Sequence, residues 1–267
     1  MTADMEIVCI GNELLIGKVL NTNAQWLSSQ ATLAGISVRR VTVVRDEIKE
    51  IVAAIRETLR RKPRFLITTG GLGPTFDDMT LEGIAKALNR KLVVNKKALK
   101  MVKDKYEAFA VENRSEFEMT QPRVKMATLP RNVKPIFNPI GTAPGVRIEA
   151  RNTLLIALPG VPKEMEAIFV ESVLPMLKQA SGDLAFHQSS MYANNIMESS
   201  LAPLIDSVMH DNPDVYVKSH PRGRENRPNI EIHLSTTVGE AEKPAETLER
   251  AMMQLSKAIE EAGGKVV

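Results

Sequence analysis

The segment TTGGLGPTFDDMT, residues 68–80, combines glycines and carboxylates in a way that suits phosphate chemistry. It follows a short apolar run and carries Gly70, Gly71 and Gly73 before a helical pattern begins. Backbone N–H groups of glycine can approach an anion closely because no Cβ stands in the way. The pattern therefore predicts an anion cradle at these three glycines, just before the N-terminus of a helix.

Four carboxylates follow three of the apolar runs of the sequence: Glu13, Asp46, Asp77 and Asp78. Carboxylate oxygens hold Mg²⁺ and similar divalent ions, and such an ion lowers the pKa of bound water and neutralises phosphate charge. We expect Glu13, Asp77 and Asp78 as metal ligands and Asp46 as a base or further ligand. The cofactor predicted in this way is a divalent metal ion.

The elements that would position these residues alternate between strand and helix. Gly35 supplies a helix stop, and residues 48–59 carry an apolar stripe at helical spacing. This alternation predicts an α/β fold, a mostly parallel sheet with helices on both faces, whose binding crevice lies at the carboxyl ends of the strands. The expected strands are residues 5–10, 36–44, 64–69 and 153–158, and the expected helices begin near residues 22, 46, 80, 96 and 162.

A break in the helical pattern at residues 178–186 predicts a domain boundary. The first domain would cover residues 1–177. The second, residues 183–267, shows a β-α-β-β-α pattern closed by a short terminal strand, which predicts a small α+β domain.

Charge and composition narrow the class of protein. Residues 1–182 hold 27 Lys/Arg and 19 Asp/Glu, whereas residues 183–267 hold 8 and 13. A basic first part suits a phosphate-bearing ligand, although scattered lysines are as often a solvated surface. A single cysteine and no long apolar segment favour a soluble protein of the reducing cytoplasm, with no membrane partner.

Structural explanations compete with the functional ones. Asp46 and Asp78 can each cap the helix that follows, and glycines after a strand commonly form a tight turn. Neither a dinucleotide-binding fingerprint nor a P-loop is present, because Phe76 stands at the third glycine position and no Gly-Lys-Ser/Thr follows. The functional hypothesis rests on several such loops converging on one sheet edge.

Four ordered motifs, GNELLIGKVLNTN, TTGGLGPTFDDMT, NPIGTAPG and LPGVPKEM, resemble a known family. Over residues 5–177 they are similar to the molybdopterin-binding-like fold of the MoaB and MogA proteins, and more closely to the N-terminal domain of CinA-type proteins. The C-terminal part resembles that of stand-alone archaeal members, without the amidohydrolase domain of bacterial CinA proteins.

The resemblance implies two activities at one crevice. CinA-type domains imply metal-dependent hydrolysis of the pyrophosphate of ADP-ribose, with FAD as a further substrate. The molybdenum cofactor branch implies binding or adenylylation of molybdopterin, and its catalytic aspartate corresponds to Asp78. Leu72 in place of the usual threonine, and Phe76-Asp77-Asp78 in place of a single aspartate, depart from that branch. The resemblance also implies a homodimer.

Other polar residues give weaker predictions. Asn21 and Asn138 can bind ribose or base, or can equally serve as a cap and a turn residue. The basic segment at residues 218–227 predicts a phosphate or RNA contact, or else a solvated hairpin loop, and the acidic surroundings make a broad nucleic-acid surface unlikely. The four histidines show no metal-ligand spacing.

Overall fold

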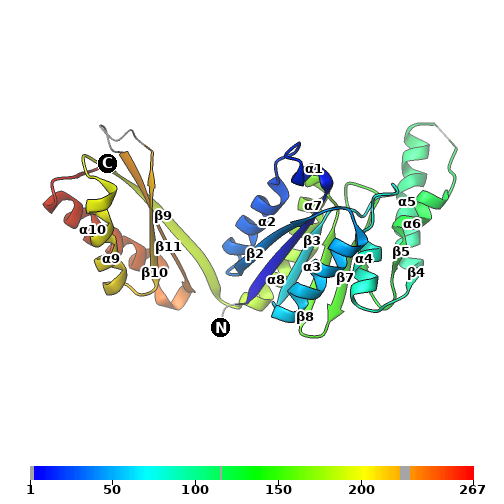
Figure 1. Ribbon diagram of the computed structural model, residues 1–267, viewed down its shortest axis with the longest axis horizontal. Helices are drawn as coiled ribbons and strands as arrows, with labels where there is room; N and C mark the ends of the chain where they lie inside the picture. The colour runs from blue at the N-terminus through cyan, green and yellow to red at the C-terminus, as the bar shows by residue number, and fades with distance from the viewer. Residues whose placement is uncertain (1–2, 115, 223–228) are drawn as a thin grey trace. The chain divides into compact units, whose positions relative to one another are not determined.

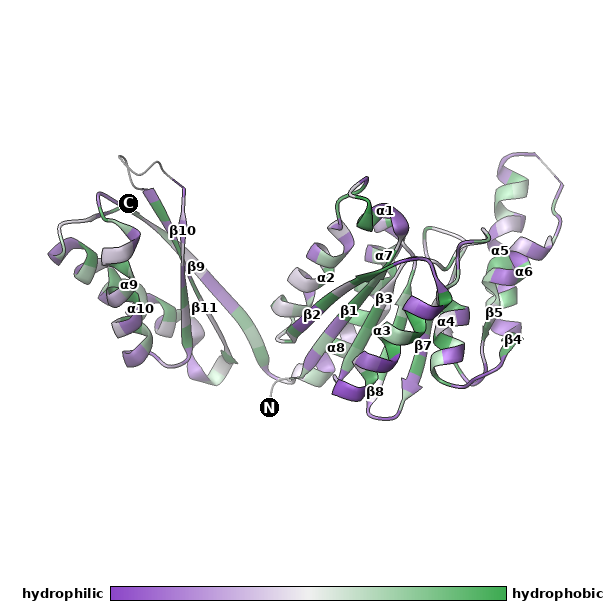
Figure 2. Ribbon diagram, viewed as in Figure 1, coloured by the Kyte–Doolittle hydropathy of each residue, from purple (hydrophilic) through white to green (hydrophobic). Residues whose placement is uncertain are grey.

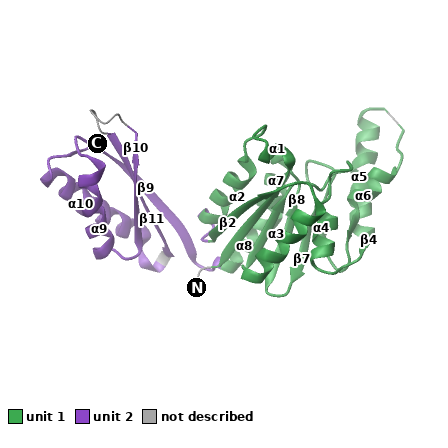
Figure 3. Cartoon of the chain, in the orientation of Figure 1, with its two compact units in different colours: residues 1–32, 36–180 green, residues 33–35, 181–267 purple. Residues whose placement is uncertain are grey.

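The computed structural model of the chain describes residues 3–114, 116–222 and 229–267. The chain forms two compact units (Figure 3): residues 1–32 with 36–180, and residues 33–35 with 181–267. The division predicted from the sequence differs from these bounds by a few residues and by the short segment 33–35.

The first unit is built on a six-stranded sheet in the order β2-β1-β3-β8-β7-β6. The strands β2, β1, β3 and β8 are parallel, and β7 and β6 continue the sheet in antiparallel pairing. The parallel arrangement of the first three strands confirms the prediction, whereas the two antiparallel strands were not predicted. The strands are β1 (Asp4–Ile10), β2 (Ser37–Val44), β3 (Phe65–Thr69), β6 (Lys134–Ile136), β7 (Gly145–Ala150) and β8 (Thr153–Leu158).

Helices cover both faces of this sheet, with α2 and α8 on one side and α3 and α4 on the other (Figure 1). This arrangement confirms the predicted α/β class. The helices of the unit are α1 (Asn12–Leu15), α2 (Thr22–Leu33), α3 (Ile48–Arg61), α4 (Thr80–Ala87), α5 (Lys96–Glu112), α6 (Gln121–Met126), α7 (Pro162–Ile168) and α8 (Leu174–Ser181), with a π-helical turn at Phe169–Val173 and a hairpin of β4 (Leu92–Val94) and β5 (Thr128–Pro130).

Burial on both faces explains why the inner strands are mostly apolar, with Glu6 of β1 as a buried exception (Figure 2). Val8 and Ile10 of β1 pack in one cluster with Ile51 and Ile55 of α3 and with Ile84 of α4. Cys9, which lies between them on β1 and faces the other side of the sheet, is buried as well. The apolar stripe at helical spacing therefore places α3 correctly.

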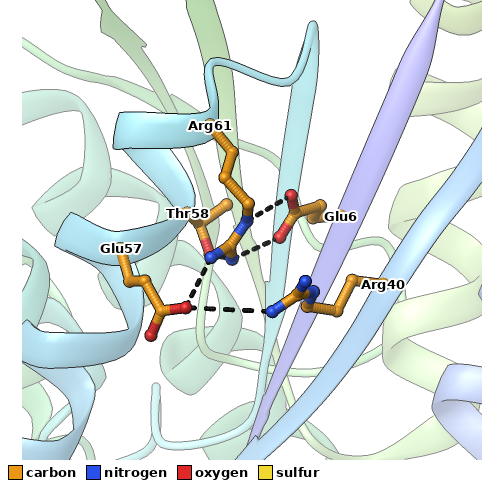
Figure 4. Close-up of polar contacts among 5 residues, drawn as sticks. All are labelled: Glu6, Arg40, Glu57, Thr58 and Arg61. Atoms are coloured by element: carbon orange, nitrogen blue, oxygen red, sulfur yellow. Dashed lines mark hydrogen bonds and ion pairs between the residues drawn. The ribbon is translucent and has the colours of Figure 1, made fainter.

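One ion pair crosses from α3 to the central strand β1 (Figure 4). The Arg61 guanidinium donates from Nε to Glu6 Oε1 at 2.8 Å and from Nη2 to Glu6 Oε2 at 2.6 Å. The side chain of Glu6 is only 5% exposed, and Arg61 also donates to Glu57 and Thr58. The forked pairing raises the pKa of Arg61 and keeps this buried carboxylate matched by a positive charge.

The second unit is an antiparallel sheet in the order β10-β11-β9-β12 with α9 and α10 against one face (Figure 1). This confirms the predicted small α+β domain with a terminal strand. Its elements are β9 (Leu184–Asn194), α9 (Glu198–Asp211), β10 (Val215–Pro221), β11 (Asn229–Gly239), a 3-10 turn at Glu240–Glu242, α10 (Pro244–Glu261) and β12 (Lys265–Val266).

The basic segment predicted as an RNA contact lies only partly within the described residues. Arg222 pairs with Glu231, its Nε lying 2.7 Å from Oε2, while Arg224 and Arg227 lie outside the described residues. The RNA hypothesis therefore stays a prediction.

None of the helices in the described ranges is both long enough and apolar enough to span a membrane.

Candidate phosphate-binding site

Three loops meet where the adjacent parallel strands β1, β3 and β8 end. Gly70, directly after β3, donates its N–H to Leu158 O of β8 at 3.1 Å. A Cβ on Gly70 would lie 2.1 Å from Ile10 O of β1, and the residue has φ +103°, so only glycine fits this position. Gly160, in the loop after β8, approaches so closely that its own Cβ would lie 3.3 Å from Gly70 Cα. The predicted convergence at one sheet edge is present.

The cradle segment, defined as Gly71 to Gly73, holds backbone N–H groups that the protein does not use. Within the described residues, the N–H groups of Gly71, Leu72 and Gly73 donate to no protein acceptor. Thr80, the first residue of α4, fixes the segment by donating its N–H to Gly71 O at 3.2 Å and its hydroxyl to Gly70 O at 2.8 Å. The segment thus lies beside a helix N-terminus with donors to spare, which is the requirement for anion binding.

Asp78 braces the loop between the cradle segment and α4. Its Oδ2 accepts the N–H of Thr75 at 2.7 Å and the Thr75 hydroxyl at 2.6 Å. It also lies against Gly73, whose Cβ would be 2.7 Å from the same oxygen. The residue before α4 is Met79, and its side chain makes no cap bond. The alternative explanation of Asp78 as a helix cap is therefore wrong, because Asp78 closes a turn instead.

Asp77 points to solvent beside the same turn. The Thr75 hydroxyl donates to it, and this bond, with the charge of Lys125 as a smaller cause, lowers the pKa of Asp77. Lys125, which comes from α6, donates to the carbonyl of Thr75. Asp77 is consequently an ionised, accessible carboxylate next to the cradle segment.

Asp46 follows β2 and lies near the other carboxylates. Its Oδ2 accepts the N–H of Asn12 at 2.7 Å, so it anchors α1, whereas Glu47 is the residue that precedes α3. The expectation that Asp46 caps α3 is wrong for that reason. Burial raises the pKa of Asp46, as do the negative charges of Glu13 and Asp77, and the bond from Asn12 opposes the change. Three of the predicted carboxylates therefore influence one another electrostatically.

Replacing Asp46 by asparagine is expected to leave the fold as stable or more stable at neutral pH. A carboxyl whose pKa is raised on folding contributes stability below its ordinary value of 3.8, and this contribution is lost as pH rises through the folded value. Asparagine keeps an acceptor for Asn12 without the charge. Thermal unfolding of both proteins across the acid range should show their difference shrinking as pH falls. A variant that is less stable at neutral pH would contradict this account.

The two predicted asparagines hold the loops in place. Asn21 accepts the N–H of Ala24 at 3.1 Å, so it caps α2, as its alternative explanation predicted, and its side chain also acts to lower the pKa of the Cys9 thiol. Asn138 is 2% exposed, and its amide oxygen and nitrogen together make four bonds to its own loop and to Glu164. Both side chains have structural partners within the protein, which leaves contact with ribose or base as a prediction.

Asn23 ties two of the converging loops together, and sequence reasoning missed it. Its amide donates to Thr69 Oγ1 at 3.0 Å and to Gly160 O at 2.8 Å. Its carbonyl oxygen is buried and has no hydrogen-bond partner among the described residues. A small cavity of about 90 Å³ adjoins it, lined also by Glu13 and Gly70. The only sequence signal for Asn23 was its place at the end of the motif GNELLIGKVLNTN, in which Asn21 was the predicted site residue.

Comparison with known proteins identifies the larger unit. Residues 6–179 match the family described as "Probable molybdopterin binding domain". The chain belongs to this family. The predicted resemblance over residues 5–177 is thereby confirmed, and the match covers all but the first two residues of the sheet that carries the site.

Relatives of this chain match it over nearly the whole of both sequences. A protein from Pyrobaculum aerophilum is 45% identical over 254 residues, which are 95% of this chain and 93% of the relative. Another, from Saccharolobus solfataricus, is 39% identical over 260 residues, 97% and 93% of the two chains. The crystal structure of the CinA protein of unknown function from Thermoplasma acidophilum is 40% identical with a TM-score of 0.59, covering 65% of this chain and 98% of that one. The likeness to CinA is confirmed.

The structure gives no complete set of side-chain ligands for a metal ion among the described residues. Within the residues described, no three His, Cys, Asp or Glu side chains gather closely enough to hold an ion. Mg²⁺ is commonly held by one or two carboxylates together with the phosphates of a ligand. The charge of Asp77 raises the pKa of Asp46, and Asp78 lies in the turn next to Asp77. Binding of a divalent ion by these carboxylates stays a prediction.

Proposed function

We propose that this protein binds a small molecule carrying phosphate, a pterin or a nucleotide, with its phosphate at the cradle segment. The observation that supports it best is the run of three backbone N–H groups, beside the start of α4, that have no acceptor among the described residues. Such groups attract an anion because the helix dipole adds a partial positive charge at the same place. The family described as probably molybdopterin-binding makes a phosphate-bearing pterin the first candidate.

Gly71→Ala is expected to weaken ligand binding by about tenfold or more, as expected for the loss of one good charge-assisted hydrogen bond. Gly71 has φ +65°, and its new Cβ would lie 2.3 Å from Thr80 Oγ1, so the cradle segment must shift. Calorimetry with pyrophosphate and AMP as probes would measure the effect. Fluorescence of the supernatant after denaturing freshly purified protein would test for a bound pterin.

Gly182→Ala is the matched control for this experiment. Gly182 has φ +64° with nothing within 4 Å of its Cβ position, so the variant bears the same backbone strain away from the loop. We expect Gly182→Ala to bind as the parent protein does. Equal binding by both glycine variants, or equal loss in both, would count against the cradle.

A second candidate function is hydrolysis of a nucleotide pyrophosphate such as ADP-ribose, with FAD as an alternative substrate. The specific observation in its favour is the group of acidic side chains around Asp46, where burial and neighbouring charge raise the pKa of a carboxyl. A bound divalent ion would neutralise phosphate charge and acidify a water molecule.

The protein's own residues would act on that water and on the phosphate. The Asp46 carboxylate would take a proton from the water molecule as the water oxygen attacks one phosphorus. The N–H groups of the cradle segment would hold the phosphate oxygens during the attack. The P–O bond of the pyrophosphate breaks, giving AMP and ribose 5-phosphate. Release of AMP from ADP-ribose, FAD, NAD or ATP, with and without Mg²⁺, tests this candidate. The expected homodimer also stays a prediction. The molar mass of the protein in solution would test it, and a monomeric mass would contradict it.

A further inference from the structure

A second cavity lies at the opposite end of the central sheet from the cradle segment. It measures about 600 Å³ and is bordered by the ends of α3 and α4 and by the turn between β7 and β8. Since β8 runs parallel to β3, the start of β8 at Thr153 marks the amino ends of the parallel strands. The cavity is therefore separate from the phosphate site proposed above.

The lining of this cavity is strongly basic and contains no Asp or Glu. Within the described residues none of its five cations has an ion-pair partner. Carboxylates nearby are paired with other cations, as Glu57 is with Arg61. The five cations, called here the basic cluster, are Arg56, Arg60, Lys62, Arg90 and Arg151.

Two members of the basic cluster are fixed by main-chain carbonyls. Arg56 donates to Lys86 O at 3.1 Å, at the end of α4, and Arg90 donates to Glu149 O at 2.7 Å. Carbonyl groups hold a guanidinium in place without cancelling its charge, and they leave some of its five N–H donors free. Such fixed cations lose little side-chain freedom when a ligand binds.

The end of α4 explains the position of Arg56, but it does not explain the rest of the cluster. Within the described residues, the side chains of Arg60, Lys62 and Arg151 make no hydrogen bond. All three are exposed at the cavity. Three uncompensated cations around one concave surface repel one another, and an anion would relieve that repulsion.

The backbone around the cavity is also unusual. Lys62, Asn89 and Arg151 all line it, and they have φ values of 57°, 53° and 57°. Glycine adopts this left-handed conformation without the steric cost that a side chain brings. The chain instead carries a lysine and an arginine at two of these positions, which puts charge where the backbone favours glycine.

We propose that this cavity is a second anion site, which binds a small molecule carrying two or more phosphate groups. The charge of the basic cluster exceeds that of one phosphate, and guanidinium groups match phosphate oxygens in pairs. The volume lies in the range of small-molecule sites. The aliphatic side chains of Leu59, Ala87 and Leu88 form an apolar part of the wall that suits the remainder of such a ligand.

Titration calorimetry with tripolyphosphate, at low and at near-physiological salt, tests the proposal. The double variant Arg60→Gln/Arg151→Gln removes two exposed cations and should bind at least tenfold more weakly. The control Lys49→Gln/Lys97→Gln removes the same charge from exposed lysines outside the cavity and should bind as the parent protein does. Gly71→Ala should retain the part of the tripolyphosphate binding that Arg60→Gln/Arg151→Gln loses, which separates the cavity from the cradle segment.

Three results would overturn the proposal. They are absence of tripolyphosphate binding by the parent protein, undiminished binding by Arg60→Gln/Arg151→Gln, and an equal loss in the lysine control, which would indicate a general charge effect. Unchanged emission from Trp26, which packs on Phe169 with ring centroids 5.3 Å apart, would verify that the first unit of each variant is folded.

Discussion

Asp78→Asn is expected to lower hydrolysis of ADP-ribose about 10²-fold, if the second candidate function is correct. Asparagine retains one oxygen that can accept the N–H and hydroxyl of Thr75, so the turn after the cradle segment should stay closed. The negative charge is lost, and with it the attraction for a divalent ion. The free energy of unfolding should change by no more than about 1 kcal/mol.

The measurement pairs AMP release in the presence of Mg²⁺ with thermal unfolding, for Asp78→Asn and for Asp77→Asn. Asp77 is the matched comparison because it lies beside the same turn and shares the Thr75 hydroxyl, yet it is fully exposed. Full activity in the Asp78 variant would leave that residue with its bracing role alone. Loss of activity only in the Asp77 variant would transfer the catalytic role to Asp77.

Arg61→Met is expected to destabilise the first unit by about 3 kcal/mol or more, because it leaves a buried carboxylate without its partner. Glu6 lies on the central strand β1 with its side chain 5% exposed, and both of its oxygens accept from Arg61 (Figure 4). Unfolding in guanidinium chloride, followed by the emission of Trp26, would report on this unit because the chain has no other tryptophan.

Two controls make the Arg61 experiment specific. Arg40→Met removes a cation that lies 3.8 Å from Glu57, with both side chains more than half exposed, and should cost less than about 1 kcal/mol. Glu6→Leu combined with Arg61→Met should recover much of the lost stability, since no charge is then left buried. A loss below about 1 kcal/mol in Arg61→Met alone would contradict the account of a buried pair.

The parallel strands of the sheet could be predicted because their apolar sequence runs match their burial on both faces. Strands covered on both faces require continuous apolar runs, and the runs at β1, β3 and β8 are of this kind. The short antiparallel strands β6 and β7 were not predicted. β6 has three residues, and residues 134–150 also contain the NPIGTAPG loop, so no clear period of two stands out.

The sequence predicted which loops form the site. It did not predict which side chains bond to one another within it. Gly70 was predicted as part of the anion cradle, but it donates its N–H to Leu158 O and instead allows the close approach of Ile10 O. The partner of Asp46 is Asn12, 34 residues away, so the choice between capping α3 and anchoring α1 could not come from local sequence. Asn23 joins loops that follow β3 and β8, and only the folded chain brings those together.

The single cysteine has a practical consequence for labelling. Cys9 lies in β1 with 0% of its surface exposed, and burial raises the pKa of its thiol, so little reactive thiolate is present at neutral pH. Maleimide dyes should therefore leave the folded native chain unlabelled. One cysteine introduced at an exposed position, such as Lys49 or Lys257, would then carry a fluorophore or spin label at a unique place, with no need to mutate the strand at the centre of the sheet.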